Sequence, residues 1–250
     1  MKFFRQLVSA LHTHTRFPLG PSALQWADAP AGAALIQLPA VGWLVGLVAC
    51  VVVALFGIAL PTNPYSPLAA GVGCVAVTLA LFGARNEEGL ATMPRALGLV
   101  SPASFQSETL TMVTAMLARV ALLAVLAANS PGAVLCALFA GHVVSRFSQL
   151  LLPRLLDFIG NADREGLVAI DNRALGLAAA WCSVPLLVAA WAKGPAFVLV
   201  AVLASGIVTT LLVHLCRTRL QGYTRDAFDA AQPCCEIAFL LGAACALGSA

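Results

Sequence analysis

The stretch RNEEGLA, residues 85–91, ends a long apolar run and places two adjacent carboxylates before a glycine. A second polar stretch, LQGYTRDAFD, residues 220–229, closes a later apolar run. The chain is 60% hydrophobic and only 10% charged, so these stretches are among the few places that offer polar chemistry. We therefore expect them to face one another at the cytoplasmic mouth of a helical membrane protein.

The composition is typical of a membrane protein. Its mean hydropathy is +0.92, whereas soluble domains are about half apolar and about a quarter charged. The apolar residues are mostly Ala, Leu and Val, which favours helices over the alternating strands of a barrel. The eight cysteines include no CxxC pair, so a zinc or disulfide framework is not expected. The first twenty residues carry Lys, Arg and His and lack the apolar core of a signal peptide.

Seven apolar runs predict an all-α fold, a polytopic transmembrane bundle with about seven spans. The runs cover residues 38–60, 66–84, 109–128, 131–152, 174–192, 195–215 and 234–249. The last run is short for a bilayer about 30 Å thick, and Pro233 is a candidate interruption just before it. We predict one integral membrane domain over residues 1–250. Its residues 1–35 form a cytoplasmic or interfacial segment, with an amphipathic helix at 3–11.

Basic residues predict the orientation of the bundle. Only Lys193 falls on the side opposite the N-terminus, while Arg119 and Arg146 lie within spans. The other eleven are Lys2, Arg5, Arg16, Arg85, Arg95, Arg154, Arg164, Arg173, Arg217, Arg219 and Arg225. The positive-inside rule then places the N-terminus in the cytoplasm and the C-terminus outside. The acidic residues gather on the same half, so function is expected at the cytoplasmic face.

Carboxylates are the first candidates for chemistry. Glu87 and Glu88 offer hard oxygen ligands that suit Mg²⁺ beside a phosphate, and Gly89 allows close approach of a backbone or ligand. A solvated helix end explains the same pair equally well. Asp226 and Asp229 are three residues apart and share a helix face, and Glu236 follows seven residues later on that face. Capping of a helix is the alternative reading of these three acids.

Two arginines lie within spans, where charged residues are costly and usually functional. Arg146 shares a face with His142 and is predicted to point into the bundle, toward the region of Glu88 and Asp226, and to bind phosphate. Alternatively, the Arg146 side chain extends along the helix and places its guanidinium at the cytoplasmic surface. Arg119 lies near the middle of a span and needs a polar partner, for which Glu108 is the candidate. The remaining histidines are expected at the membrane interface; they are His12, His14 and His214.

Several stretches together resemble the cobalamin synthase family, adenosylcobinamide-GDP ribazoletransferase. Residues 15–18, Thr-Arg-Phe-Pro, match a family motif, and residues 38–46 match the Pro-x-x-Gly-x-x-x-Gly entry to the first span. Residues 86–91 follow the first half of the family's acidic motif, and residues 141–146 resemble its Ser-Arg helix. The final motif is matched at Gly222, Thr224, Asp226, Ala230 and Glu236.

The resemblance implies a Mg²⁺-dependent transferase of the bacterial inner membrane. Its substrates would be adenosylcobinamide-GDP and α-ribazole or its phosphate, with release of GMP. The implied catalytic residues are Glu88, Asp226 and Glu236. The implied substrate-binding residues are Arg146, Asn86, Gly89, Thr224 and Arg95, and the implied metal ligands are Glu87, Glu88, Asp226 and Asp229. Contact with membrane lipid is expected, binding of nucleic acid is not, and a homo-oligomer is left open.

This sequence departs from the family pattern in both motifs. The first motif has Asn86 in place of His, Glu88 in place of Asp, and Thr92 and Arg95 in place of two further acids. The last motif has Gln221, Arg225 and Asp229 in place of glycines, and Pro233 in place of Glu. The family's Asp-Ser-Arg-x-Gly segment has no counterpart in residues 101–107, where the loop is shorter.

These losses predict weak metal binding and low activity. Two alternative functions therefore stay open: a family member that serves as a binding or assembly subunit, and a small-solute transporter.

Overall fold

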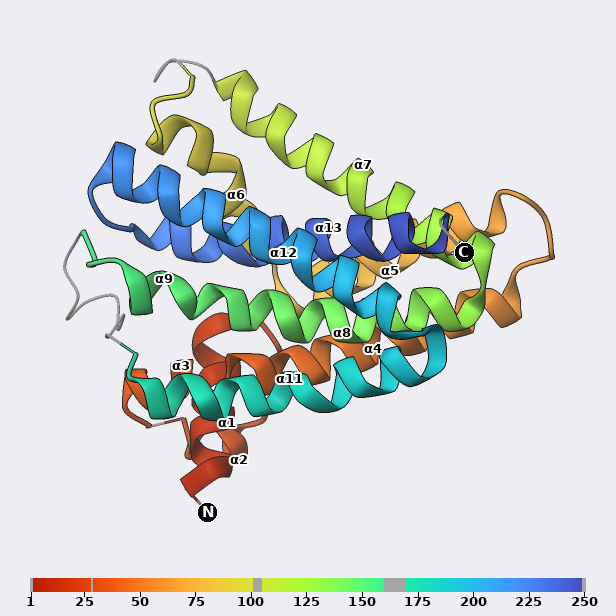
Figure 1. Cartoon of the computed structure of the whole chain (residues 1–250). Coiled ribbons are helices and arrows are strands. Elements are labelled where there is room, and N and C mark those ends of the chain that lie inside the picture. Colours follow the sequence, from red (N-terminus) through yellow and green to blue (C-terminus); the bar gives the residue numbers. More distant parts are fainter. Residues whose placement is uncertain (1, 28, 101–104, 160–169, 249–250) are drawn as a thin grey trace.

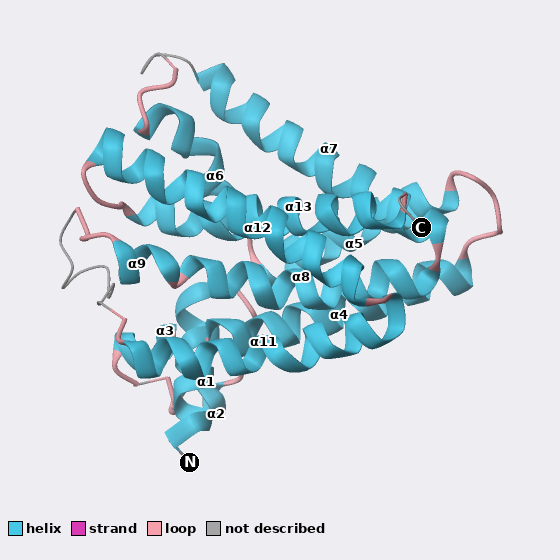
Figure 2. Ribbon diagram, viewed as in Figure 1, coloured by secondary structure: helices cyan, strands magenta, loops and turns pink. Residues whose placement is uncertain are grey.

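The computed structural model describes every residue except 1, 28, 101–104, 160–169 and 249–250. Its described part is helical, and no strand occurs in it beyond an isolated bridge between Phe158 and Tyr223 (Figure 2). Among those residues, six helices are long and apolar enough to cross a membrane, or seven if one bent pair counts as a span. The predicted helical membrane bundle is therefore confirmed.

The long helices follow the predicted apolar runs closely. They are α4 (Leu38–Ala59), α5 (Ser66–Phe82), α7 (Phe105–Asn129), α8 (Pro131–Gln149), α11 (Asn172–Lys193), α12 (Pro195–Leu215) and α13 (Arg225–Leu247). Shorter helices are α1 (Lys2–His14), α2 (Pro21–Leu24), α3 (Ala31–Leu35), α6 (Arg85–Ala96) and α9 (Leu151–Leu155), with a π-helical turn, η1 (Cys216–Leu220). The N-terminal amphipathic helix is thus present as α1, which packs against α3 and α4.

Local chemistry explains where the helices begin. Pro131 and Pro195 occupy the first positions of α8 and α12, where a missing N–H costs nothing. Side-chain oxygens of Ser130, Asp171 and Thr224 accept hydrogen bonds from backbone N–H groups in the first turns of α8, α11 and α13.

The last span differs from its prediction. Instead of beginning at residue 234, α13 begins at Arg225 and runs without a break through Pro233. It has 23 residues, so it is not short for a bilayer. The charged residues 225–229 were left outside the predicted span, although Asp226 and Asp229 were placed on one helix face, and they form the first turns of this helix.

Helix α13 lies lengthwise in the bundle and packs against α12, α6, α8 and α7 (Figure 1). Small residues allow close packing elsewhere, as in other membrane bundles. A Cβ on Gly42 of α4 would lie 2.6 Å from the carbonyl oxygen of His142 in α8, and one on Gly242 of α13 would lie 2.7 Å from Ala201 in α12. These approaches bring α8 close to α4 and α13 close to α12, and α8 and α13 carry His142, Arg146, Gln232 and Glu236 of the candidate site.

Helices α5 and α6 form the bent pair. Gly83 ends α5 with a φ of 83°, a conformation that favours glycine, and α6 begins two residues later. The two axes differ by 97°, so the RNEEGLA stretch turns back against the bundle instead of ending a straight span. Of the eleven basic residues used for the orientation, Arg164 lies outside the described residues.

Candidate functional site

The two polar stretches meet, as the sequence predicts. Helix α6 packs against α13. A Cβ on Gly89 would lie 2.8 Å from both the carbonyl oxygen of Asp226 and the Cβ of Asp229. Gly89 therefore permits close contact between α6 and α13. Its predicted role in substrate binding stays a prediction.

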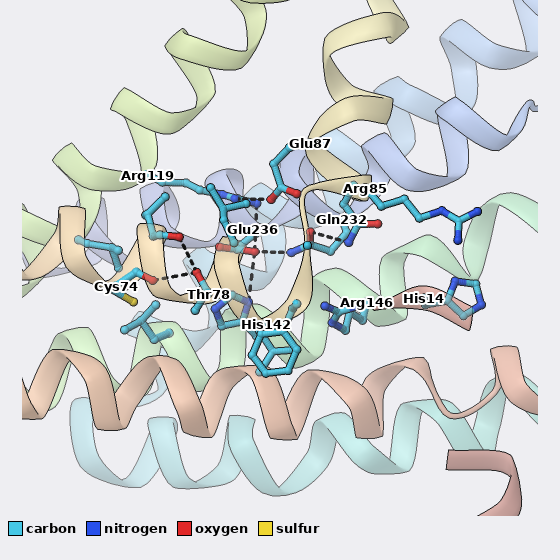
Figure 3. A pocket seen from close by; sticks show the side chains of 18 residues that line it. His14, Cys74, Thr78, Arg85, Glu87, Arg119, His142, Arg146, Gln232 and Glu236 are labelled. Atoms are coloured by element: carbon cyan, nitrogen blue, oxygen red, sulfur yellow. Dashed lines mark hydrogen bonds and ion pairs between the residues drawn. The ribbon is translucent and has the colours of Figure 1, made fainter. Parts of the chain in front are cut away.

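A buried ion network extends from this contact into the bundle. Arg119 of α7 places one guanidinium nitrogen 2.6 Å from Oε1 of Glu87 and another 3.3 Å from Oε2 of Glu236. Nδ1 of His142 lies 3.3 Å from the same Glu236 oxygen, and Gln232 donates a hydrogen bond to it. Figure 3 shows these side chains converging from α6, α7, α8 and α13. One arginine thus pairs with two carboxylates from distant parts of the sequence, so these three side chains together carry a net charge of −1.

Arg146 lies next to this network but outside it. Its side chain is buried, with 4% of the residue exposed. It makes no hydrogen bond or ion pair with any residue that the structure describes, and its buried Nε has no partner. The prediction that Arg146 points into the bundle is confirmed, but it shares the cavity with Glu87 and Glu236 instead of the expected Glu88 and Asp226. A buried guanidinium with no hydrogen bond or direct ion pair is costly, so this arginine is the strongest sign of a binding site.

A small cavity joins these groups. Its polar lining includes Glu87, Arg119, His142, Arg146 and Glu236. It has about 40 Å³ of room for water-sized groups, and about 570 Å³ when the part open to solvent is included. The cavity therefore admits a larger ligand only through its open side.

His14 of α1 and Arg85 of α6 line one end of the cavity, which we call its mouth because the Arg85 side chain is 42% exposed (Figure 3). Arg85 donates a hydrogen bond to the carbonyl oxygen of Thr13 at 2.7 Å and lies 3.3 Å from Oδ2 of Asp229. Arg225 approaches the same Asp229 oxygen to 3.1 Å. His14 is buried, and burial together with the charges of Arg225, Arg85 and Arg146 lowers its pKa to about 3. His14 is thus neutral at pH 7.

The other predicted site residues lie away from the cavity or serve the helices. Glu88 and Asp226 are exposed. Arg95 pairs with Glu108 of α7. Thr224 caps α13 by accepting a hydrogen bond from the N–H of Ala227. Their predicted catalytic and binding roles stay predictions.

Asn86 does line the cavity, and its side chain donates a hydrogen bond to Gln232 at 3.1 Å.

The carboxylates do not form a metal site. Glu87 is paired with Arg119, and Asp229 is paired with both Arg85 and Arg225. The other two predicted ligands, Glu88 and Asp226, are exposed. Across the described residues, no group of three or more His, Cys, Asp or Glu side chains is placed to hold a metal ion. The residues present therefore do not fit a protein-held Mg²⁺, and dependence on Mg²⁺ stays a prediction.

Several site residues were assigned differently from sequence. Arg119 was expected to meet Glu108, but its partners are Glu87 and Glu236. His14 was expected at the membrane interface, but it is buried at the mouth. Gln232 was not predicted as a site residue. Its position one helical turn before Glu236 on α13 is the sequence signal that could have identified it.

A family model and curated relatives both match this chain over most of its length. The family model described as cobalamin-5-phosphate synthase matches residues 6–102 and 109–244. The unmatched residues between the two parts, 103–108, overlap residues 101–107, where the family's Asp-Ser-Arg-x-Gly segment was not recognised. Among solved structures, no significant match was found.

Curated relatives cover nearly the whole chain. An adenosylcobinamide-GDP ribazoletransferase of Polaromonas sp. (strain JS666 / ATCC BAA-500) is 32% identical over 281 aligned residues, 98% of this chain and 98% of its own length. Proteins of the same name from Polaromonas naphthalenivorans (strain CJ2) and Albidiferax ferrireducens are 30% and 31% identical and cover 99% and 98% of this chain. The first alignment is longer than the 250 residues of this chain, so that relative has residues with no counterpart here.

Proposed function

Since the chain belongs to the cobalamin-5-phosphate synthase family, we propose that it catalyses the reaction named for its relatives, adenosylcobinamide-GDP ribazoletransfer. The cobinamide-phosphate group moves to a hydroxyl of α-ribazole or its phosphate, and GMP leaves. The observation that supports this most is Arg146. It is a buried, unpaired guanidinium in a cavity whose other side carries Glu236, at the place where the family's motifs meet.

Each cavity residue has a role that its geometry supports. Arg146 would bind the phosphate being transferred, because a guanidinium pairs well with phosphate oxygens and stabilises charge that develops there. Glu236, 3.3 Å from Nδ1 of His142, forms a carboxylate–imidazole pair that would accept the proton of the attacking hydroxyl. Arg119 would hold Glu236 and Glu87 in place. A bond from the acceptor oxygen to phosphorus forms while the bond from phosphorus to GMP breaks.

The protein would act within the bacterial inner membrane, with its N-terminus and the cavity mouth in the cytoplasm. The bias of basic residues supports this orientation. The cavity mouth is also formed by α1, at the N-terminus. Both substrates would then reach the site from the cytoplasm, and the apolar outer faces of the helices would contact lipid.

A second candidate function is nucleotide binding without turnover, as a binding or assembly subunit. The ion pairs of Glu87 and Asp229 favour it, because two of the four predicted metal ligands are engaged by arginines. Purified protein in detergent, given adenosylcobinamide-GDP and α-ribazole with Mg²⁺, distinguishes the two. Release of GMP that requires α-ribazole supports the transferase. Binding of adenosylcobinamide-GDP with no release of GMP supports the second candidate.

A further inference from the structure

We propose that the cavity binds the diphosphate of its nucleotide substrate through the protein's own arginines, with no divalent cation held by the protein. The proposal rests on the function proposed above and concerns how the same site neutralises its substrate. It differs from what the family resemblance implies, which is a Mg²⁺ site built from acidic residues. Three observations carry it: the charge balance, the position of Arg146, and the partners of the carboxylates.

The charge balance leaves one excess positive charge at the site. The cavity and the ion pairs at its mouth contain four guanidinium groups and three carboxylates; they are Arg85, Arg119, Arg146 and Arg225 against Glu87, Asp229 and Glu236. Arg119 with its two carboxylates carries a net charge of −1, and Asp229 with the two arginines at the mouth carries +1. Arg146 is the one of these four guanidinium groups that has no direct ion pair, and it brings the total to +1. Since excess buried charge is unfavourable, the site is completed by an anion.

The chemistry around Arg146 suits a phosphate group. A guanidinium offers several N–H donors in a planar fork that matches phosphate oxygens. The space beside it is small and opens toward Arg85, whose side chain is 42% exposed. Arg85 can therefore move aside and contact a second phosphate at the mouth, while Arg146 binds the first inside. Two arginines at two depths fit a diphosphate better than a single phosphate.

The carboxylates are already engaged by arginines. For Glu87 to bind a metal ion, it would have to give up its 2.6 Å contact with Arg119. At the mouth, Arg225 and Asp229 stand where the resembled family has glycine, so this chain has gained a cation and an anion that pair at that point. Mg²⁺ in nucleotide sites is usually held by one or two carboxylates and several phosphate oxygens. Here guanidinium groups occupy the place of that cation.

Isothermal titration tests the proposal directly. Inorganic pyrophosphate and GDP are titrated into the purified full-length protein in detergent, once with excess EDTA and once with Mg²⁺. We expect binding in EDTA, with a Kd within about twofold of that in Mg²⁺, because the protein's arginines make the contacts. The variant R146Q should bind about tenfold or more weakly, the usual effect of losing a charge-assisted contact worth about 1.4 kcal/mol. R146K should lie between the two.

The matched control is R154Q. Arg154 lies in α9, donates hydrogen bonds to Asn172 and is far from the cavity lining, so its loss should leave binding unchanged. Thermal unfolding of each variant shows whether it is folded. If R146Q does not fold, the wild-type comparison in EDTA and Mg²⁺ still decides.

The outcomes separate this inference from the proposed function. Binding that disappears in EDTA, or wild-type affinity in folded R146Q, overturns the inference, and release of GMP with Mg²⁺ would leave the transferase standing. Binding in EDTA that depends on Arg146, without release of GMP under any condition, upholds the inference and removes the transferase.

Discussion

Replacing Arg119 by Met should destabilise the protein strongly, because it leaves two buried carboxylates without their common cation. At an effective dielectric constant of about 20, charges 2.6 Å and 3.3 Å apart attract by roughly 6 and 5 kcal/mol. Desolvation offsets much of this attraction, and removing one partner of a buried pair typically costs about 3–5 kcal/mol. In a chain of this size each kcal/mol lowers Tm by about 2–4 °C, so R119M should lose roughly 6–20 °C.

The assay is thermal unfolding of the purified protein in detergent at neutral pH, followed by circular dichroism. The matched control is R95M, which removes the same charge from the ion pair with Glu108, where the arginine side chain is 41% exposed. An exposed pair is worth about 0–1 kcal/mol, so R95M should change Tm by no more than about 4 °C. The triple variant R119M/E87Q/E236Q should recover most of the loss, because it also removes the uncompensated charges.

A Tm of R119M within about 2 °C of the wild type would refute the reasoning. It would show that the carboxylates are neutral or hydrated in the protein, and that Arg119 does not hold the cavity together.

Three further predictions follow from other parts of the molecule. The pKa of His14 is about 3 in the folded protein and 6.5 in the unfolded chain. Below pH 6.5 the unfolded chain therefore binds a proton that the folded protein does not, and the free energy of unfolding should fall. By pH 4.5 the free energy of unfolding should have fallen by about 2.7 kcal/mol. Unfolding measured as a function of pH should show this loss in H12Q and not in H14Q. G89A should destabilise by about 1–3 kcal/mol, because its Cβ would meet α13 at 2.8 Å, whereas G176A, in open space on α11, should stabilise by up to about 1 kcal/mol. Reporter fusions should indicate the outer side in the three short loops at Asn63, Asn129 and Lys193, and cytoplasmic signals at two of them would contradict the orientation.

Sequence alone predicts the helices well, because a long apolar run in a bilayer can satisfy its backbone hydrogen bonds only as a helix. The exception is α13. Arg225 and Asp229 are charged, so the predicted span begins only after them, yet here Asp229 pairs with both Arg225 and Arg85 within the helical bundle. Tertiary partners let the helix begin nine residues before the apolar run.

The candidate site was predicted only in part, for a geometric reason. Burial of Arg146 follows from its position inside a span. The partners of Arg119 do not follow from position, because the 97° turn between α5 and α6 brings Glu87 back into the bundle. The hydrophobic periodicity of residues 66–96 does not signal the turn between α5 and α6. The same turn leaves Glu88 on the outside, although it is adjacent in sequence.

The central claim is that the cavity between Arg146 and Glu236 is the reaction site. It is tested most directly by release of GMP from adenosylcobinamide-GDP and α-ribazole, compared between wild type and E236Q. Loss of a group that accepts a proton in the transition state typically lowers the rate by about 100-fold or more. We predict α-ribazole-dependent release by the wild type and a loss of that size in folded E236Q. Equal rates in the two proteins would contradict the claim and place the chemistry elsewhere in the chain.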